Sequence, residues 1–198
     1  MDRNTLLKEL REYWIKNTVP NISDINAQFL KDLITIKKAK NILEIGTANW
    51  FSTIHLAIAA EKNDWKVTSI ELSIPSYAEA QVNIKNANLE KNVKLIFWNA
   101  LDEIPKFKNK EFDFVFIDWM MRATKNFLWL IWNKVETGWV IIIDDVIKFK
   151  NKMPGFKEFL ENHKIKHNIL PIDVEDNDWI MMIIKQDFDI DYKVEKMN

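Results

Sequence analysis

The stretch Leu43-Glu44-Ile45-Gly46-Thr47-Ala48-Asn49-Trp50-Phe51-Ser52 decides the fold. It begins in a short apolar run, 41–45, with the length of a buried strand, and leads into 54–58, where apolar residues recur at helical spacing. A strand that passes directly into a helix is typical of doubly wound α/β proteins, which bind nucleotide-like ligands at this turn. Because Gly46 has no Cβ, the backbone can approach such a ligand closely. The same sequence also suits an ordinary tight turn.

Strands and helices alternate downstream of this turn. Four further strands are predicted from apolar runs at 67–71, 93–97, 112–117 and 139–143. Helices are predicted after Pro75, over 124–133 and near 154–163, and the first of these is expected to turn Ala78, Val82 and Leu89 inward. Two last strands, near 166–172 and 179–185, are close enough to pair antiparallel. This alternation predicts a parallel, doubly wound sheet.

Two helices are predicted ahead of the first strand. One covers 4–16, and the second starts at a cap provided by Ser23 or Asp24. We expect a single domain over 1–186, in which the N-terminal helices of 1–38 form either a cap on the site or a homodimer contact. Residues 187–198 are polar and are expected to form a frayed tail.

The composition is that of a globular protein of one domain. The chain has 198 residues, and its formal net charge of −1 provides no overall basic footprint for nucleic acid. It contains no cysteine, which excludes disulfides, a thiolate zinc site and a cysteine nucleophile. The first ten residues lack the apolar centre of a signal peptide, and the apolar runs are too short to span a bilayer. We therefore expect a cytoplasmic protein without membrane association.

Glu71 is a candidate ligand-binding residue because it ends the second strand, about 20–25 residues past the glycine turn. A carboxylate at this place can accept hydrogen bonds from both ribose hydroxyls of a nucleotide. An acid at a strand end is otherwise simply solvated. The pairing of Glu71 with the Gly46 turn favours the ligand interpretation.

Three aspartates follow two buried strands. Asp118 comes directly after 112–117, and Asp144 and Asp145 come directly after 139–143. Because neighbouring parallel strands end at the same edge of a sheet, these carboxylates are expected to gather beside the ligand crevice. They would repel one another unless a cation or a proton compensates, and oxygen-only ligands suit magnesium, calcium or manganese. The alternative is that Asp144 or Asp145 caps the next segment.

Residues 19–185 resemble the bacterial O-methyltransferase family related to catechol O-methyltransferase. The stretch 42–56 is similar to the family motif LEIGTxxGYSTxxLA, and DFVFID at 113–118 is similar to the family's fourth-strand motif. The motifs occur in family order and at family spacing over most of the chain. The matching stretches are 19–23, 42–56, 67–71, 113–118 and 138–146.

This resemblance implies a Rossmann-like class I methyltransferase fold: a seven-stranded, mostly parallel sheet with a C-terminal antiparallel hairpin and helices on both faces. It also implies methyl transfer from S-adenosylmethionine to a hydroxyl oxygen of a small molecule, often assisted by Mg²⁺ or another divalent cation. The residues that would line the cofactor are Glu44, Gly46, Trp50, Ser52, Glu71, Ala100 and Asp118. The residues that would hold the metal, which would clamp two substrate oxygens, are Asp118, Asp144 and Asp145.

Two positions depart from the family pattern. Met121 stands where the family has a lysine proposed as the base, and methionine cannot take a proton. Asp145 stands where asparagine is common, and it adds a charge. The candidate catalytic residues are therefore Asp118 and Arg122, although arginine stays protonated and cannot serve as the base. Deprotonation by the metal alone and loss of activity are both compatible with this pattern.

Glycine occurs 3 times and tryptophan 9 times, whereas about 14 glycines would be usual at this length. Because GGA and UGA differ by one base and some bacteria read UGA as glycine, we interpret several tryptophans as glycines of the native protein. The suspected positions are Trp50, Trp65, Trp98, Trp139 and Trp179, with Trp14 and Trp119 as further cases. Trp132 is interpreted as a genuine tryptophan. UGG codons in the native gene would contradict the idea, and the alternative is a divergent protein that tolerates its tryptophans.

Three other functions compete with small-molecule O-methylation. Methylation of a hydroxylated nucleoside in RNA fits the same resemblance, but the near-neutral charge speaks against it. A nicotinamide dehydrogenase would need the third glycine of GxGxxG, which this turn lacks. A non-catalytic relative that binds a partner protein is supported by Met121 and by the tryptophans.

Overall fold

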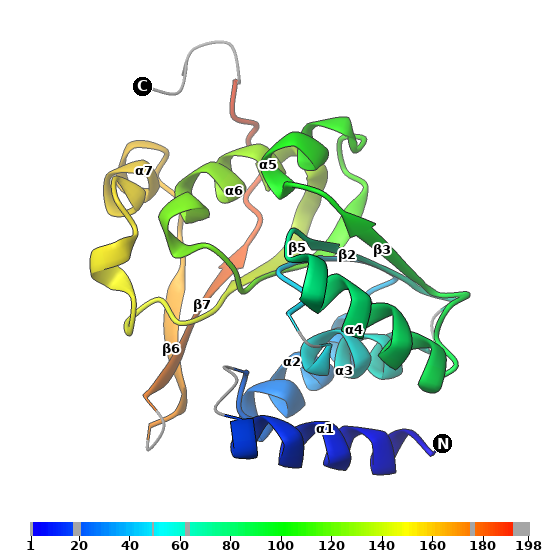
Figure 1. Cartoon of the computed structure of the whole chain (residues 1–198). Helices are drawn as coiled ribbons and strands as arrows, with labels where there is room; N and C mark the ends of the chain where they lie inside the picture. Colours follow the sequence, from blue (N-terminus) through cyan, green and yellow to red (C-terminus); the bar gives the residue numbers. More distant parts are fainter. Residues whose placement is uncertain (1, 18–20, 49, 62–63, 175–176, 192–198) are drawn as a thin grey trace.

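The computed structural model describes residues 2–17, 21–48, 50–61, 64–174 and 177–191. Within them the chain forms one seven-stranded sheet, with the strand order β3-β2-β1-β4-β5-β7-β6 (Figure 1). The strands are β1 (Asn41–Ile45), β2 (Lys66–Glu71), β3 (Val93–Phe97), β4 (Phe112–Ile117), β5 (Val135–Ile143), β6 (Asn168–Asp173) and β7 (Asp178–Ile184). Strands β1 to β5 are parallel, whereas β7 pairs antiparallel with both β5 and β6. The predicted sheet and its terminal hairpin are confirmed.

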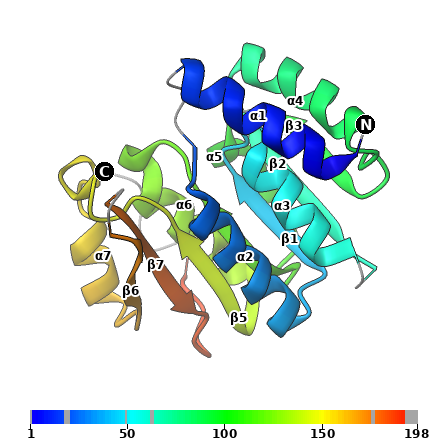
Figure 2. The same cartoon turned by 90° about the horizontal axis from the view of Figure 1, so that it is seen from below.

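Helices cover both faces of the sheet, as predicted. Figures 1 and 2 show α1 to α4 on one face and α5 to α7 on the other. The helices are α1 (Arg3–Asn17), α2 (Asp24–Lys37), α3 (Phe51–Ala60), α4 (Ile74–Asn86), α5 (Ala100–Glu103), α6 (Thr124–Ile131) and α7 (Phe156–Asn162). None of the helices described here is both long and apolar enough to cross a membrane.

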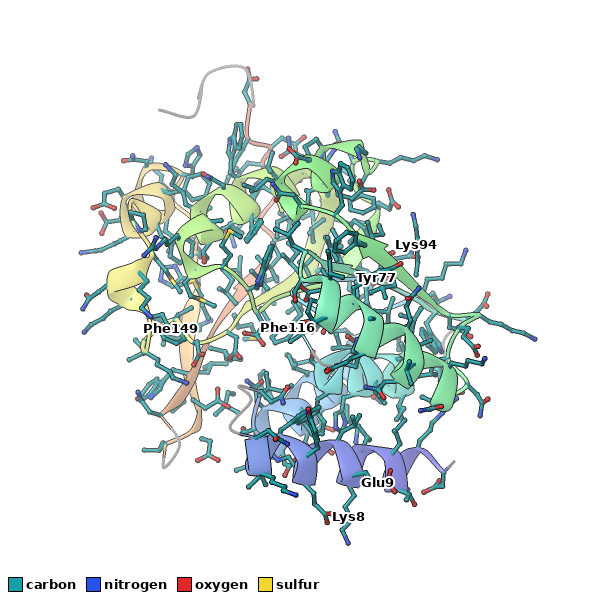
Figure 3. The ribbon with its side chains drawn as sticks, in the orientation of Figure 1. Lys8, Glu9, Tyr77, Lys94, Phe116 and Phe149 are labelled. Carbon is teal, nitrogen blue, oxygen red and sulfur yellow. The ribbon has the colours of Figure 1, made fainter. Side chains whose placement is uncertain are left out.

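The central strand β4 shows why the sheet has two cores. Phe114 and Phe116 belong to the apolar cluster shared with α1 to α4, while Val115 and Ile117 belong to the cluster shared with α5 to α7. Successive side chains of a strand point to opposite faces, so an uninterrupted apolar strand serves both clusters. Figure 3 shows the labelled Phe116 in the middle of the molecule and Phe149 at its margin, in the segment after β5.

The N-terminal helices pack against α3, as Figure 2 shows. The ring of Trp14 in α1 meets the ring of Phe51 edge-on, with 4.8 Å between centroids. Helix α2 begins at Ser23, whose side chain accepts a hydrogen bond from the backbone N–H of Asn26, so Ser23 rather than Asp24 is the cap. Val19 and Pro20, which opened the family resemblance, lie outside the described residues.

Two predictions of local structure are wrong. Helix α4 buries Ala80 and Ile84, whereas Ala78 and Val82 are exposed; of the three residues predicted to turn inward, Leu89, just past the helix, is buried. The polar tail does not begin at 187, because Ile190 is buried and its N–H donates to the Oδ1 of Asn133 at 2.9 Å. The folded domain therefore extends past residue 186, and 192–198 lie outside the described part.

Candidate active site

The turn after β1 is closed by tight contacts around Gly46. Its φ is +94°, and a Cβ built there would lie 2.4 Å from the Cβ of Trp119 and 2.5 Å from the carbonyl oxygen of Asp118. The N–H of Gly46 donates to the carbonyl of Ile70 at 3.0 Å, and the N–H of Asp118 donates to the carbonyl of Ile45 at 3.0 Å. The ends of β1, β2 and β4 thus meet at this glycine, which no other residue can replace without displacing backbone.

Glu71 lies at the end of β2 with its carboxylate turned toward that turn. Its Oε2 accepts the backbone N–H groups of Thr47 at 3.2 Å and Ala48 at 2.8 Å. Its Oε1 accepts those of Leu72 at 2.8 Å and Ser73 at 2.6 Å. The carboxylate is therefore held rigidly at the predicted ribose position, and ribose hydroxyls would share or displace the amides of Thr47 and Ala48.

Glu44 lies one layer deeper and is completely buried. Its carboxylate accepts the hydroxyl of Ser52 at 2.5 Å, that of Ser69 at 2.6 Å, and that of Thr53. Burial raises the pKa of Glu44 to about 7, and the three hydroxyl donors only partly oppose this rise. The hydrogen bond between Ser52 and Glu44 thus links α3 to β1 beneath the turn.

The raised pKa of Glu44 predicts a pH dependence of stability. The folded chain keeps this proton up to about pH 7, whereas the unfolded chain releases it near pH 4.5. The stabilisation is therefore complete below pH 4.5 and is lost as the pH rises through 7, a loss of about 3 kcal/mol. Glutamine resembles the protonated acid, so Glu44→Gln should become more stable relative to wild type by that amount between pH 4.5 and 8. Urea unfolding at several pH values measures this change.

The exposed Glu90→Gln substitution removes the same charge at the surface and serves as the control. Its stability difference from wild type should not follow the same pH window. A flat difference for Glu44→Gln across that window would contradict a buried, protonated Glu44.

A cavity of about 470 Å³ opens beside the glycine turn, at the carboxyl edge of the sheet. The three aspartates predicted to hold a metal all line it: Asp118 after β4, and Asp144 and Asp145 after β5. Asp178, at the start of β7, lines the same cavity and was not predicted. The sequence could place the first three because parallel strands end at one edge. Asp178 arrives on an antiparallel strand, so the strand-end argument did not include it.

Burial and mutual repulsion both disfavour negative charge in this acidic cavity. Burial, then the carboxylates of Asp178 and Asp145, raise the pKa of Asp144 to about 8. Burial, followed by the charges of Asp144 and Asp145, also raises the pKa of Asp118 well above its usual range. Such a group of acids needs a bound cation, a proton or a basic side chain to balance its charge.

Sequence reasoning missed the residues of α2 that hold these acids. The Nδ2 of Asn26, a fully buried residue, donates to Oδ1 of Asp144 at 3.1 Å and to Oδ1 of Asp178 at 3.2 Å. The hydroxyl of Ser23 donates to the other oxygen of Asp178 at 2.8 Å. The first turn of α2 therefore closes one side of the acidic cavity.

Lys148 is a further residue that the sequence did not single out. Its Nζ lies 3.7 Å from Oδ2 of Asp145, and both residues line the acidic cavity. The only sequence signal for it is its position three residues past the second aspartate. Lys148 brings a positive charge into a cavity where Met121 cannot supply one.

A divalent cation fits this cavity by the chemistry of its donors, because carboxylate oxygens are the ligands that hard cations prefer. Within the described ranges, however, no three His, Cys, Asp or Glu side chains converge into a preformed metal site. A cation would therefore have to draw the side chains of Asp118, Asp144 and Asp145 together.

The remaining predicted residues lie around these elements. Ala100 is buried at the start of α5, next to the end of β3. Arg122 lies in a short 3-10 helix, Met121–Ala123, and lines a separate hollow with Phe149 and Lys152. The structure therefore does not bring Arg122 into the acidic cavity with Asp118.

Trp50 has the backbone of a glycine. Its φ is +87°, it directly precedes α3, and its side chain is completely buried in the cluster that contains Trp14 and Phe51. It is not among the residues that line the acidic cavity. No other tryptophan has a positive φ; in the turn at Trp65 the left-handed residue is Asp64. The backbone argument for a native glycine therefore applies at position 50 and at none of the other suspected positions.

The site therefore combines a glycine turn after β1 with an acid at the end of β2 and an acid just past β4. The sequence profile described as O-methyltransferase matches residues 1–184. The chain belongs to the O-methyltransferase family. One relative is catechol O-methyltransferase of Mycobacterium tuberculosis, which is 35% identical over 130 residues. The match covers 64% of this O-methyltransferase and 57% of that protein. The chain thus spans little more than half the length of that relative.

Other family members extend the match. Tapetum-specific methyltransferase 1 of Arabidopsis thaliana is 29% identical over 164 residues, which cover 76% of this chain and 70% of that protein. The crystal structure of the O-methyltransferase from Bacillus cereus in complex with SAH superposes with a TM-score of 0.78 at 27% identity, over 91% of each chain. The sheet order and the terminal hairpin are therefore those of the O-methyltransferase family.

Proposed function

We propose that this chain transfers a methyl group from S-adenosylmethionine to a hydroxyl oxygen of a small molecule, and that a divalent cation at the acidic cavity assists. The observation that carries the proposal is the junction at Gly46. There the carboxylate of Glu71 and the backbone of Asp118 both contact the turn after β1. The Bacillus cereus relative is bound to SAH, which is what S-adenosylmethionine becomes after methyl transfer. That supports the cofactor.

The cofactor supplies an activated methyl group when it is bound, so the protein mainly has to align and balance charge. Glu71 would orient the ribose through its two carboxylate oxygens. Asp118, Asp144 and Asp145 would hold the cation, and the rigid support from Asn26 would keep Asp144 in place. The charged acids would be balanced by that cation, which favours the deprotonated acceptor oxygen.

Lys148 would supply the positive charge that Met121, which stands in place of a lysine, cannot provide. Its ammonium group is beside Asp145 at the cavity wall. There it would stabilise negative charge that develops on the acceptor oxygen. This role needs only the charge of Lys148, so it is compatible with deprotonation by the cation.

Calorimetry with S-adenosylmethionine tests the cofactor assignment. The Glu71→Gln substitution removes one charged acceptor that the ribose would use, so binding should weaken roughly tenfold to a hundredfold. The exposed Glu79→Gln on α4 is the matched control and should bind like wild type. Equal affinity of both variants, with circular dichroism showing both folded, would argue against Glu71 as the ribose ligand.

Methyl transfer to catechol, with and without Mg²⁺, is the first activity to measure, since a catechol O-methyltransferase is among the relatives. A non-catalytic binding role is the second candidate. It is favoured by Met121 and by the full set of backbone partners on Glu71. Cofactor binding without turnover on any hydroxylated acceptor would support that role.

A further inference from the structure

A second cavity lies on the other side of the segment that follows β5. It has a volume of about 470 Å³ and shares no lining residue with the acidic cavity. Its walls come from that segment, α7, β6 and β7, which lie side by side at the left of Figure 1. The apolar residues of the wall include Val146, Met153, Phe156, Leu160, Ile165 and Met181.

The mouth of this apolar cavity is positively charged. Three lysines, Lys150, Lys157 and Lys164, are exposed there, against the single acid Glu161. Glu161 is already paired with Lys157, at 3.6 Å. In the part of the chain that the structure describes, neither Lys150 nor Lys164 forms a salt bridge, so two ammonium groups are left to meet an anion at the rim.

We propose that this cavity binds a small amphipathic anion, with an apolar body inside and a carboxylate at the mouth. The volume lies within the range of small-molecule pockets, and an apolar wall stabilises an apolar occupant by an amount that grows with each methylene it buries. The stems of Lys150 and Lys164 extend the apolar wall while their ammonium groups reach the anion. The cavity therefore favours a carboxylate over an alcohol of the same length.

The same segment separates this cavity from the acidic one. Asp145 and Lys148 line the acidic cavity, while Val146 and Ile147 between them line the apolar cavity. The N–H of Val146 donates to the carbonyl of Trp179 at 3.1 Å, which ties the segment to β7. An occupant of the apolar cavity would contact the segment that includes Asp145, yet its binding does not require S-adenosylmethionine.

Calorimetry with sodium decanoate and 1-decanol tests the proposal, with both probes held below their aggregation limits. Decanoate should bind with one molecule per chain and more tightly than decanol. The exposed double substitution Lys150→Glu and Lys164→Glu should weaken decanoate binding by at least about tenfold, with little effect on decanol. Lys91→Glu, an exposed charge reversal outside the cavity, should bind decanoate like wild type.

A second variant tests the cavity rather than the charge. Ile169 lines the mouth and is 42% exposed, so Ile169→Trp should leave the core intact and block both probes. Decanoate binding that the double substitution and Ile169→Trp leave unchanged would overturn the proposal. Failure of wild type to bind decanoate would also overturn it, including the case in which size-exclusion chromatography shows a dimer that covers this face.

Discussion

A Gly46→Ala chain is expected to lose at least about 4 kcal/mol of its free energy of unfolding, a cost that single substitutions reach only through a severe steric or burial conflict. The added methyl would lie 2.5 Å from the carbonyl oxygen of Asp118. That carbonyl cannot step aside, because β4 pairs with β1 at Ile117 and Ile45. A φ of +94° adds strain for any residue with a Cβ.

The control for this result is another glycine with a similar positive φ. Gly138 has a φ of +85°, but nothing lies within 4 Å of its built Cβ. Gly138→Ala should therefore cost only the backbone strain, about 1 kcal/mol. Urea unfolding of both variants separates the clash from the strain. Equal losses at the two positions would mean that the backbone at the junction of β1, β2 and β4 can shift enough to relieve the clash.

The sheet could be predicted from the sequence because its strands are short, apolar on both faces and separated by helical patterns. A run such as Phe112–Ile117 cannot be amphipathic, and only a central strand buries both of its faces. The aspartates after β4 and β5 could be predicted for a related reason, since a parallel sheet brings strand ends together without any knowledge of loops.

Contacts between distant elements could not be predicted in this way. Asn26 reaches Asp178 across 152 positions of sequence, and no local pattern indicates that α2 closes the acidic cavity. The inward face of α4 was misassigned because Val82 is apolar but faces solvent, at 58% exposure. Ile190 was assigned to a tail because its partner, Asn133, lies in another part of the chain.

The tryptophans differ in what their indole N–H groups meet. Trp132, interpreted as genuine, donates to the carbonyl of Phe188 at 2.8 Å. The indole nitrogens of Trp14, Trp50 and Trp65 are buried without a partner, and an unmet buried donor costs about 1–3 kcal/mol. Trp139, another suspected position, donates its indole N–H to Glu136 at 3.3 Å, so the unmet donors mark only part of the suspected set.

At position 50 the glycine variant should therefore be more stable than the alanine variant, which reverses the usual order of stability. Trp50→Ala removes a fully buried indole, which costs about 3–5 kcal/mol, and recovers part of that by removing the unmet N–H. It keeps a Cβ at a φ of +87°. Trp50→Gly loses the same indole but also releases the backbone strain, so it should be more stable than Trp50→Ala by about 1–2 kcal/mol. Urea unfolding of the two variants measures the difference directly.

Trp65 provides the matched control, because it is also buried with an unmet indole N–H but has an ordinary φ. There the glycine variant should be no more stable than the alanine variant, since glycine gains no conformational relief and costs entropy in the unfolded chain. The same glycine advantage at both positions would trace the effect to the indole rather than to the backbone. An advantage confined to position 50 would show that the turn after β1 is built for glycine, so that S-adenosylmethionine binding should be measured on the Trp50→Gly chain as well as on the unsubstituted chain.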